Sequence, residues 1–216
     1  MNDSARKIQR QELLRASLAH VPFDGWNNIS LSRGAKDLGW RKEEVTRLFP
    51  AGGFDAALLF SRWADSEMLE RFSKLDLSEI RVRDRVARVI RCRLEFLQPH
   101  SEAVRRLVSF MMLPGNARHS AMALYNTADT IWRALDDTST DFNHYTKRLI
   151  AAGVLCSTTL FWLDDSSPDK EDSWGFLDRR IKNVMGIQKL RQKSDAVFKC
   201  VPNPARLLKS FRSFRV

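Results

Sequence analysis

Apolar residues recur at intervals of three and four positions along almost the whole chain, and this spacing is typical of amphipathic helices. No segment of the sequence sustains the alternation of apolar and polar residues that a half-buried strand requires. The pattern therefore predicts an all-α protein of roughly eight to ten helices. We expect these helices at residues 4–21, 31–38, 41–49, 54–72, 78–98, 101–113, 117–135, 141–163 and 168–190.

Proline, glycine and polar residues separate the expected helices and indicate where the chain divides. Two short helices flank Gly39 and Trp40, which gives the length and the glycine of a helix-turn-helix turn. Gly39 can adopt the left-handed backbone of such a turn, and the small Ala35 before it would let the two helices cross closely. We predict a helix-turn-helix-like bundle at residues 1–73, a larger helical domain at 78–190, and a linker with an amphipathic helix at 191–216.

The expected helix at 141–163 differs from the others because residues 149–163 include no charged residue. An apolar surface on all sides is typical of a helix inside a domain, and this stretch is too short to span a bilayer. The next helix is expected to begin with Ser167 as its N-terminal cap and Pro168 in its first turn.

The common patterns of catalytic and metal sites are missing from the sequence. Its four histidines have neither the His-Glu-x-x-His nor the Glu-x-x-His spacing, so we expect no helical di-iron site. Glycine-rich phosphate loops and the Gly-x-Ser-x-Gly motif are missing as well. The acidic run from Asp164 to Asp172 could bind a hard cation or begin a helix, and the second interpretation is favoured because no glycine arranges the carboxylates around a point. We predict no catalytic residues, no metal ligands and no enzyme activity.

The positive charge of the chain is concentrated at its C-terminal end. Of the formal charge of +10, residues 1–50 supply nine Lys and Arg against six Asp and Glu, and residues 51–188 carry nineteen of each kind. Residues 189–216 carry eight Lys and Arg against one Asp. The excess is therefore mostly a property of the tail, and it gives little support to nucleic-acid binding by the rest of the chain.

The cysteines and the start of the sequence bear on the compartment. Cys92, Cys156 and Cys200 are far apart and odd in number, which argues against a disulfide framework and favours a reducing environment. Because no apolar signal segment opens the sequence, we expect a cytoplasmic protein or a processed one.

The tail has the pattern of a helix that lies in a membrane interface. A merely solvated tail, or a helix that packs on its own domain, are the alternatives that the sequence leaves open. One such helix should bind weakly, because ordering the segment offsets much of the gain from burying its apolar side. Two tails on a dimer would bind far better. The residues expected at the membrane are Leu207, Leu208, Phe211 and Phe214 on the apolar side, with Arg206, Lys209 and Arg212 beside them.

A transcriptional regulator with a hydrophobic effector is the main functional alternative, because a small helix-turn-helix domain followed by a larger ligand domain is the build of bacterial one-component repressors. The candidate recognition helix, however, begins with Arg41-Lys42-Glu43-Glu44. Two glutamates at this position would face polyanionic DNA unfavourably. We therefore do not expect nucleic acid as the partner.

Two strings in the second half of the chain closely resemble the Coq-nine family of ubiquinone-biosynthesis accessory proteins. The first is Ser139-Thr140-Asp141-Phe142-Asn143-His144-Tyr145-Thr146-Lys147-Arg148. The second is Asp165-Ser166-Ser167-Pro168-Asp169, followed by Glu171-Asp172-Ser173-Trp174-Gly175-Phe176-Leu177. They occur in the order and at the spacing of the family. The resemblance implies a fold like that of TetR-type regulators, a homodimer formed through helices of the larger domain, and a bound lipid as the only ligand of cofactor type.

The resemblance also implies a function. Members of the family hold an isoprenoid quinone precursor or a phospholipid, reach the membrane with a C-terminal amphipathic helix, and serve a di-iron demethoxyubiquinone hydroxylase. The setting would be the cytoplasmic side of a bacterial inner membrane or the matrix side of the mitochondrial one. The partner patch of the family corresponds to Asp141, Phe142, His144 and Tyr145, where the mitochondrial branch has Trp in place of His144. His144 and Tyr145 could instead merely cap the central helix.

Soft and aromatic side chains between residues 101 and 163 are the candidates for lining a lipid pocket. The same side chains could form an ordinary core, and the sequence leaves both interpretations open. The candidates are Met112, Met122, Tyr125, Trp132, Cys156, Leu160 and Phe161.

Overall fold

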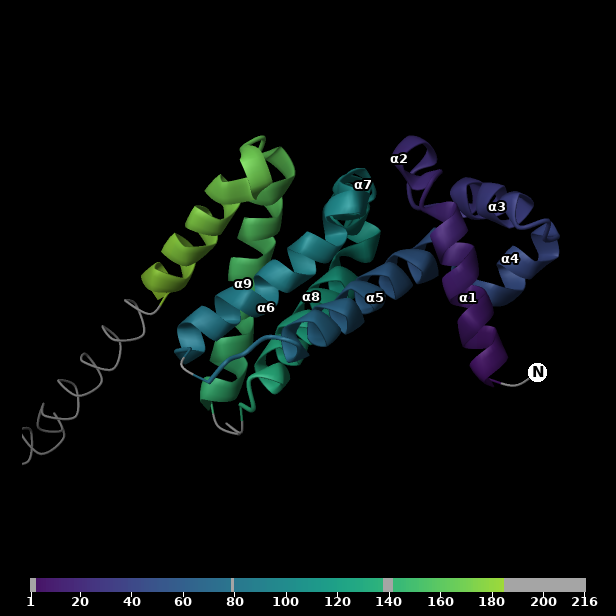
Figure 1. Cartoon of the computed structure of the whole chain (residues 1–216). Helices are drawn as coiled ribbons and strands as arrows, with labels where there is room; N and C mark the ends of the chain where they lie inside the picture. The colour runs from purple at the N-terminus through teal and green to yellow at the C-terminus, as the bar shows by residue number, and fades with distance from the viewer. Residues whose placement is uncertain (1–2, 79, 138–141, 185–216) are drawn as a thin grey trace, which may run out of the picture.

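The computed structural model describes residues 3–78, 80–137 and 142–184, and the described residues form helices, turns and loops without a strand (Figure 1). The prediction of an all-α fold is therefore confirmed. A further helix at 171–184 follows the 3₁₀ turn Pro168–Lys170. The labelled helices are α1 (Asp3–Ser17), α2 (Val21–Asp24), α3 (Asn28–Asp37), α4 (Lys42–Leu48), α5 (Gly53–Ser73), α6 (Val82–Leu97), α7 (Ser101–Met111), α8 (Ala117–Ala134) and α9 (Phe142–Asp164).

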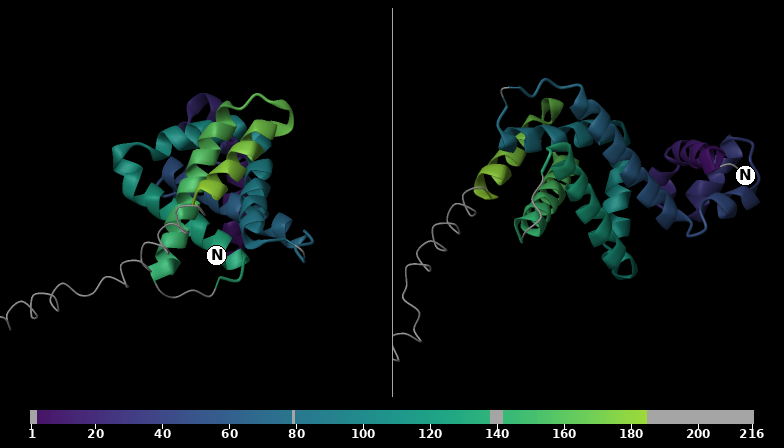
Figure 2. Two further views of the ribbon diagram at one scale, coloured as in Figure 1. Left: turned by 90° about the vertical axis from the view of Figure 1, so that its left-hand side faces the viewer. Right: turned by 90° about the horizontal axis from the view of Figure 1, so that it is seen from below.

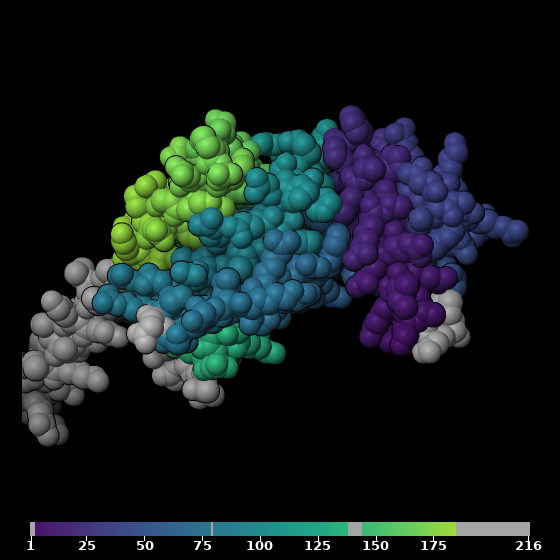
Figure 3. All heavy atoms as spheres, viewed as in Figure 1, coloured from purple at the N-terminus to yellow at the C-terminus, as the bar shows by residue number. Residues whose placement is uncertain are grey.

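Helices α1–α4 form a group at one end of the molecule, and the helix at 171–184 lies at the other end (Figures 2 and 3). Gly39 has the expected positive φ, at 71°, in the turn between α3 and α4. Gly34 of α3 makes a close contact with α1: a Cβ atom at position 34 would lie 2.4 Å from Ser17 Oγ. Gly34 therefore permits α1 and α3 to cross at backbone distance.

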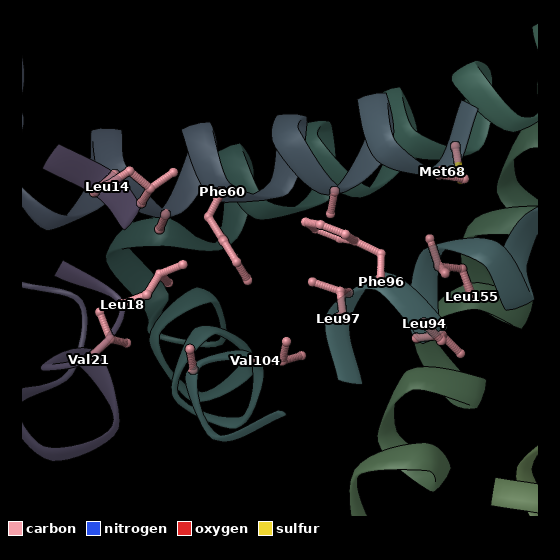
Figure 4. Packing of buried hydrophobic residues seen from close by; sticks show 14 of the residues in the cluster. Leu14, Leu18, Val21, Phe60, Met68, Leu94, Phe96, Leu97, Val104 and Leu155 are labelled. Atoms are coloured by element: carbon pink, nitrogen blue, oxygen red, sulfur yellow. The ribbon is translucent and has the colours of Figure 1, made fainter. Parts of the chain in front are cut away.

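Helix α5 leads from this group into the larger part of the molecule, where it packs against α6 and α8. Its side chain Phe60 is buried between the two parts, so the apolar core is continuous (Figure 4). Trp26 adds a polar link, because its indole Nε1 donates a hydrogen bond to the carbonyl oxygen of Ala103 in α7 at 3.0 Å. The predicted division between residues 73 and 78 falls between α5 and α6, yet the core is shared across it because α5 packs in both parts of the molecule.

Helices α8 and α9 pack side by side through small side chains. Ala128 of α8 and Ala151 and Ala152 of α9 form a buried cluster, which lets the two helices approach closely. The indole Nε1 of Trp132 donates to the carbonyl oxygen of Lys147 at 3.0 Å across the same contact. The pair is therefore fixed by both close packing and a directed hydrogen bond.

The expectation that residues 149–163 are buried on all sides is wrong. Leu149 is 64% exposed, and Gly153, Cys156 and Leu160 are exposed as well. These residues recur at intervals of three and four, so they share one face of α9. Helix α8 packs on α9 elsewhere, and no described residue covers this face. The sequence pattern indicated that residues 149–163 have an apolar surface, but it did not indicate what covers this surface.

Several predicted helix boundaries also need correction. The first helix ends at Ser17, and Pro22 stands near the start of the separate helix α2 instead of after one long helix. Proline suits such a position because the first N–H groups of a helix have no intrahelical partner. Helix α6 begins at Val82 and not at residue 78, since Arg85 donates to the carbonyl oxygens of Leu77 and Ile80 and holds that segment in a loop.

The last described helix begins later than predicted, and Asp165 contributes to its cap together with Ser167. Asp169 has a positive φ of 49°, and regular helix starts only at residue 171. Ser167 stands at the N-cap position before Pro168, and its hydroxyl accepts from the backbone N–H of Asp172 at 3.1 Å. The Asp165 carboxylate adds to this cap, because it accepts from the backbone N–H groups of Ser167 at 2.7 Å and Ser173 at 2.9 Å. The favoured interpretation of the acidic run as a helix start is thus supported. The remainder of the predicted helix, residues 185–190, lies outside the described residues.

Candidate lipid-binding cavity

An apolar cavity of about 320 Å³ lies between α7, α8 and the second half of α9, and α5 and α6 contribute to its walls. This volume is at the lower end of the range for small-molecule sites. Helix α7 supplies one wall because its apolar residues share a single stripe, while α8 and α9 supply the others. The aliphatic wall includes Val104, Leu107, Val108, Leu124 and Leu155.

The lining changes from buried to exposed along the cavity. Phe60, Leu97 and Val104 are almost inaccessible to solvent, whereas Met112 is 74% exposed and Leu160 lies partly in solvent. The cavity therefore has a closed inner end and an open mouth between the end of α7 and the second half of α9. A chain-like apolar ligand could enter at this mouth and extend beyond it.

The inner end carries a polar cluster built from α5, α6 and α8. The Arg93 guanidinium donates from Nε to Asp65 Oδ1 at 2.9 Å and from Nη2 to Ser61 Oγ at 3.2 Å. The Thr127 hydroxyl donates to Asp65 Oδ2 at 2.9 Å. Arg93 and Thr127 are 7% and 2% exposed, whereas Asp65 is half-buried and also lines the polar groove beside α5. Arg93, Ser61 and Thr127 also line the cavity.

The structure brings only some of the predicted lipid-contacting residues to this cavity. Met112, Cys156 and Leu160 line it. Met122 lies on a different face of α8 and lines a polar groove beside α5. Tyr125, Trp132 and Phe161 are not among the lining residues: Trp132 bonds to Lys147, and Phe161 stacks on Phe176 with ring centroids 4.4 Å apart.

Sequence reasoning missed the polar cluster, although one signal was present. Arg93 continues the inward register of Val86, Ile90 and Leu97 at intervals of three and four. A charged side chain within an apolar stripe must be paired or solvated. This position could have been selected on that basis, but Asp65 and Thr127 lie on other helices and no spacing identifies them.

The predicted partner patch is only partly described. Tyr145 is 60% exposed, and its ring meets the ring of His144 edge-on with centroids 5.1 Å apart. Asp141 lies outside the described residues, and the side chain of Phe142 is not described. Tyr145 is thus on the surface at the start of α9, where a partner could reach it.

A buried arginine fixes the backbone beneath this patch. Arg148 donates from Nε to Asp129 Oδ1 at 2.5 Å and from Nη1 to Asp137 Oδ2 at 3.2 Å. Its Nη1 also donates to the carbonyl oxygen of His144 at 3.0 Å. Arg148 is 2% exposed, and its two carboxylate partners belong to α8 and to the turn that follows it. The network positions the first turn of α9 relative to α8.

The remaining predicted sites concern the membrane and metal ions. The residues expected at the membrane, 206–214, lie outside the described residues. Among the helices within the described ranges, none combines the length and the apolar character that crossing a bilayer requires. In the same ranges no group of three His, Cys, Asp or Glu side chains is arranged to hold a metal ion.

Comparison with solved structures places the fold. A TetR transcriptional regulator from Nitrosomonas europaea ATCC 19718 matches with a TM-score of 0.65 and 16% sequence identity, over 81% of this chain and 96% of the regulator. At this identity the likeness concerns the fold alone. The helix order, with its small N-terminal group and the cavity in the larger part, defines an all-helical protein of the TetR-like fold.

Sequence comparisons then show the family. The COQ9 family model matches residues 117–188. The "Ubiquinone biosynthesis protein COQ9, mitochondrial" of Rattus norvegicus is 34% identical over 86% of this chain, and that of Homo sapiens is 32% identical over 86%. COQ9-B of Xenopus laevis is 31% identical, with 96% of this chain and 74% of the relative covered. The chain belongs to the COQ9 family, and it spans 61% of the rat relative and 60% of the human one.

Proposed function

We propose that this chain is a non-catalytic, lipid-binding accessory protein of ubiquinone biosynthesis. In this role it holds an isoprenoid quinone precursor and presents it at the membrane to a di-iron demethoxyubiquinone hydroxylase. The relatives carry ubiquinone biosynthesis in their names. The observation that carries the proposal for this chain is the cavity: an apolar space of about 320 Å³ with one closed end and one open mouth suits a ring with an isoprenoid tail.

Quinone profiling after deletion of the gene in its source cell tests this role. We expect ubiquinone to fall and the demethoxy precursor, the substrate of the hydroxylase, to accumulate, because the hydroxylase would lack presented substrate. Expression of the full chain should restore the ubiquinone level. Unchanged amounts of both quinones in the deletion strain would refute a role in this step.

Contact with the hydroxylase is proposed through the start of α9, around the exposed Tyr145. Aromatic side chains that are exposed in the free protein and buried on binding often dominate an interface. Tyr145→Ala should therefore weaken co-purification of the hydroxylase, while Phe23→Ala, which removes another exposed aromatic ring on α2, should leave it unchanged. Equal recovery with both variants would count against this contact.

A homodimer is proposed through the first half of the exposed face of α9, which leaves the cavity mouth at Cys156 and Leu160 free. Leu149 and Gly153 lie on this face beside the close contact of α8 with α9, so a second copy could extend the same packing. Leu149→Glu would place a charge in that interface. Light scattering after size exclusion should give twice the chain mass for the wild type and one chain mass for Leu149→Glu. A wild-type protein of one chain mass would contradict the dimer.

Membrane contact is proposed for residues 206–214 by the segregation of apolar and basic residues in the sequence. The setting is the matrix face of the mitochondrial inner membrane, as the relatives are named mitochondrial, or the equivalent cytoplasmic face in a bacterium. Flotation with vesicles that contain anionic lipid should be lost when residues 203–216 are deleted. It should weaken in Leu149→Glu, because two tails on a dimer act together.

A TetR-type regulator with a hydrophobic effector is the alternative, and the fold alone favours it. Helix α4 has seven residues, and Glu43 and Glu44 stand in its first turn. This charge opposes contact with phosphates at the position where a recognition helix meets DNA. A gel-shift assay at low salt with fragments of the source genome separates the two functions, since tight sequence-selective binding would favour the regulator.

A further inference from the structure

The polar cluster at the inner end of the cavity indicates what kind of lipid head group the protein selects. We propose that Arg93 anchors the ligand head, and that this head is uncharged and carries oxygen acceptors, as a quinone ring does. The inference rests on the proposed lipid-binding function and adds to it the residue that binds and selects the head group.

Arg93 has hydrogen-bonding capacity that the protein does not use. A guanidinium group has five N–H donors on three nitrogen atoms. In Arg93, Nε and Nη2 bond to Asp65 and Ser61, and no bond from Nη1 is found to any residue of the described ranges. The side chain is more than nine-tenths buried and lines the cavity. An acceptor on a ligand in the cavity could therefore take up a donor that no described protein group uses.

The charge at this end is already balanced. Arg93 is the one charged side chain among the described residues that line the cavity, and the Asp65 carboxylate pairs with it at 2.9 Å. Thr127 donates to the same carboxylate and holds it in place. A carboxylate or phosphate head would bring a second negative charge without a second cation, and burying an unpaired charge is costly. A neutral carbonyl oxygen accepts the hydrogen bond without this cost.

The shape of the cavity agrees with a head at the inner end and a tail at the mouth. Phe60 and Leu97 are buried beside Arg93, whereas Met112 and Leu160 at the other end are exposed. A volume of about 320 Å³ accommodates a ring and the first part of a chain. The rest of a long isoprenoid tail would leave through the mouth, where it could remain in contact with a lipid surface.

Displacement of the neutral dye Nile red from the full-length protein tests the inference. Three competitors share a ten-carbon chain and differ in the head: decylubiquinone, decylbenzene and decanoate. For the wild type we expect decylubiquinone to compete at a concentration lower than decylbenzene by about tenfold or more, as a hydrogen bond to a charged donor predicts. Decanoate should compete no better than decylbenzene.

The variant Arg93→Met/Asp65→Asn removes the anchor and leaves no unpaired charge. It should bring decylubiquinone to the level of decylbenzene, while Arg91→Met/Glu95→Gln, the same change on the exposed side of α6, should keep the preference. A preference for decanoate, or no preference among heads in the wild type, would overturn the inference without need of a variant. Failure of every competitor and of the dye to bind would instead overturn the lipid-binding function itself.

Discussion

Gly34 of α3 lies against Ser17 of α1 so closely that a Cβ atom at position 34 would stand 2.4 Å from Ser17 Oγ and 2.8 Å from Ser17 Cα. One of these neighbours is backbone and cannot move without shifting α1. The close packing of α1 against α3 therefore depends on the absence of a side chain at position 34. Ser17 itself is fixed, because its hydroxyl donates to the carbonyl oxygen of Leu13 at 2.7 Å.

Gly34→Ala should accordingly lower the free energy of unfolding by about 1–3 kcal/mol, the usual cost of overpacking. Urea denaturation followed by circular dichroism measures the change. Gly175→Ala is the matched control, because its Cβ would meet only the movable end of Arg179 at 3.3 Å. This control should gain up to about 1 kcal/mol from helix propensity. Equal effects of both substitutions would contradict the close crossing.

Arg93 and Asp65 should depend on each other for stability. Arg93→Met leaves the half-buried Asp65 carboxylate without its cation, and we expect a loss of about 2 kcal/mol in the free energy of unfolding. The double variant Arg93→Met/Asp65→Asn should recover part of this loss because no charge remains unpaired. Arg91→Met, which breaks the exposed pair with Glu95, should cost about 1 kcal/mol or less. If the denaturation curves of the three variants coincided, that result would contradict burial of the Arg93–Asp65 pair.

The two described cysteines should differ in reactivity. Cys156 is exposed and lines the cavity mouth, whereas Cys92 is buried in α6, and this burial raises the pKa of its thiol. N-ethylmaleimide should therefore modify Cys156 quickly and Cys92 slowly, since the thiolate is the reactive form. In a Cys200→Ser background, peptide mapping would follow each site. Decylubiquinone should slow the modification of Cys156 and leave Cys92 unaffected; equal protection of both would indicate a general change and not occupancy of the cavity.

The cap of the last described helix should make stability sensitive to acid. Burial opposes ionisation of Asp165, but hydrogen bonds from Ser167 and Ser173 outweigh it and lower the pKa of this carboxyl to about 2. The ionised cap therefore stabilises the fold above about pH 4, the unfolded value, and this contribution is lost as the pH falls toward 2. Asp165→Asn should flatten the decline measured by thermal melting between these pH values, and Ser173→Ala should flatten it in part. A decline unchanged in Asp165→Asn would contradict this cap.

The helical fold could be predicted from the sequence because the spacing of apolar residues and the positions of proline and glycine are local properties of the chain. The interval pattern located α5, α7 and α8 to within a few residues, and Gly39 marked its turn correctly. The first helix was drawn too long because Pro22 was taken only as a stop, although proline also suits the start of a helix. Local signals therefore indicate that a helix is present more reliably than where it begins.

The site was less predictable because it is made by contacts between distant segments. Met112, Cys156 and Leu160 could be identified as soft residues near an expected pocket, but the orientation of Met122 depends on how α8 is rotated against α5. The exposure of one face of α9 was not predicted for the same reason. An apolar pattern indicates that a surface will be covered, but it does not indicate which part of the chain or which partner covers it. Arg93 was visible as an anomaly in its helix, whereas its pairing with Asp65 required the three-dimensional arrangement.

Native mass spectrometry of the full-length protein, purified without detergent from its source cell, tests the central claim most directly. The account predicts a bound species whose mass fits an isoprenoid quinone or its precursor, at one lipid per chain, released by organic solvent and identified by fragmentation. A protein that carries no lipid under these conditions, and takes up no quinone when one is supplied, would contradict it.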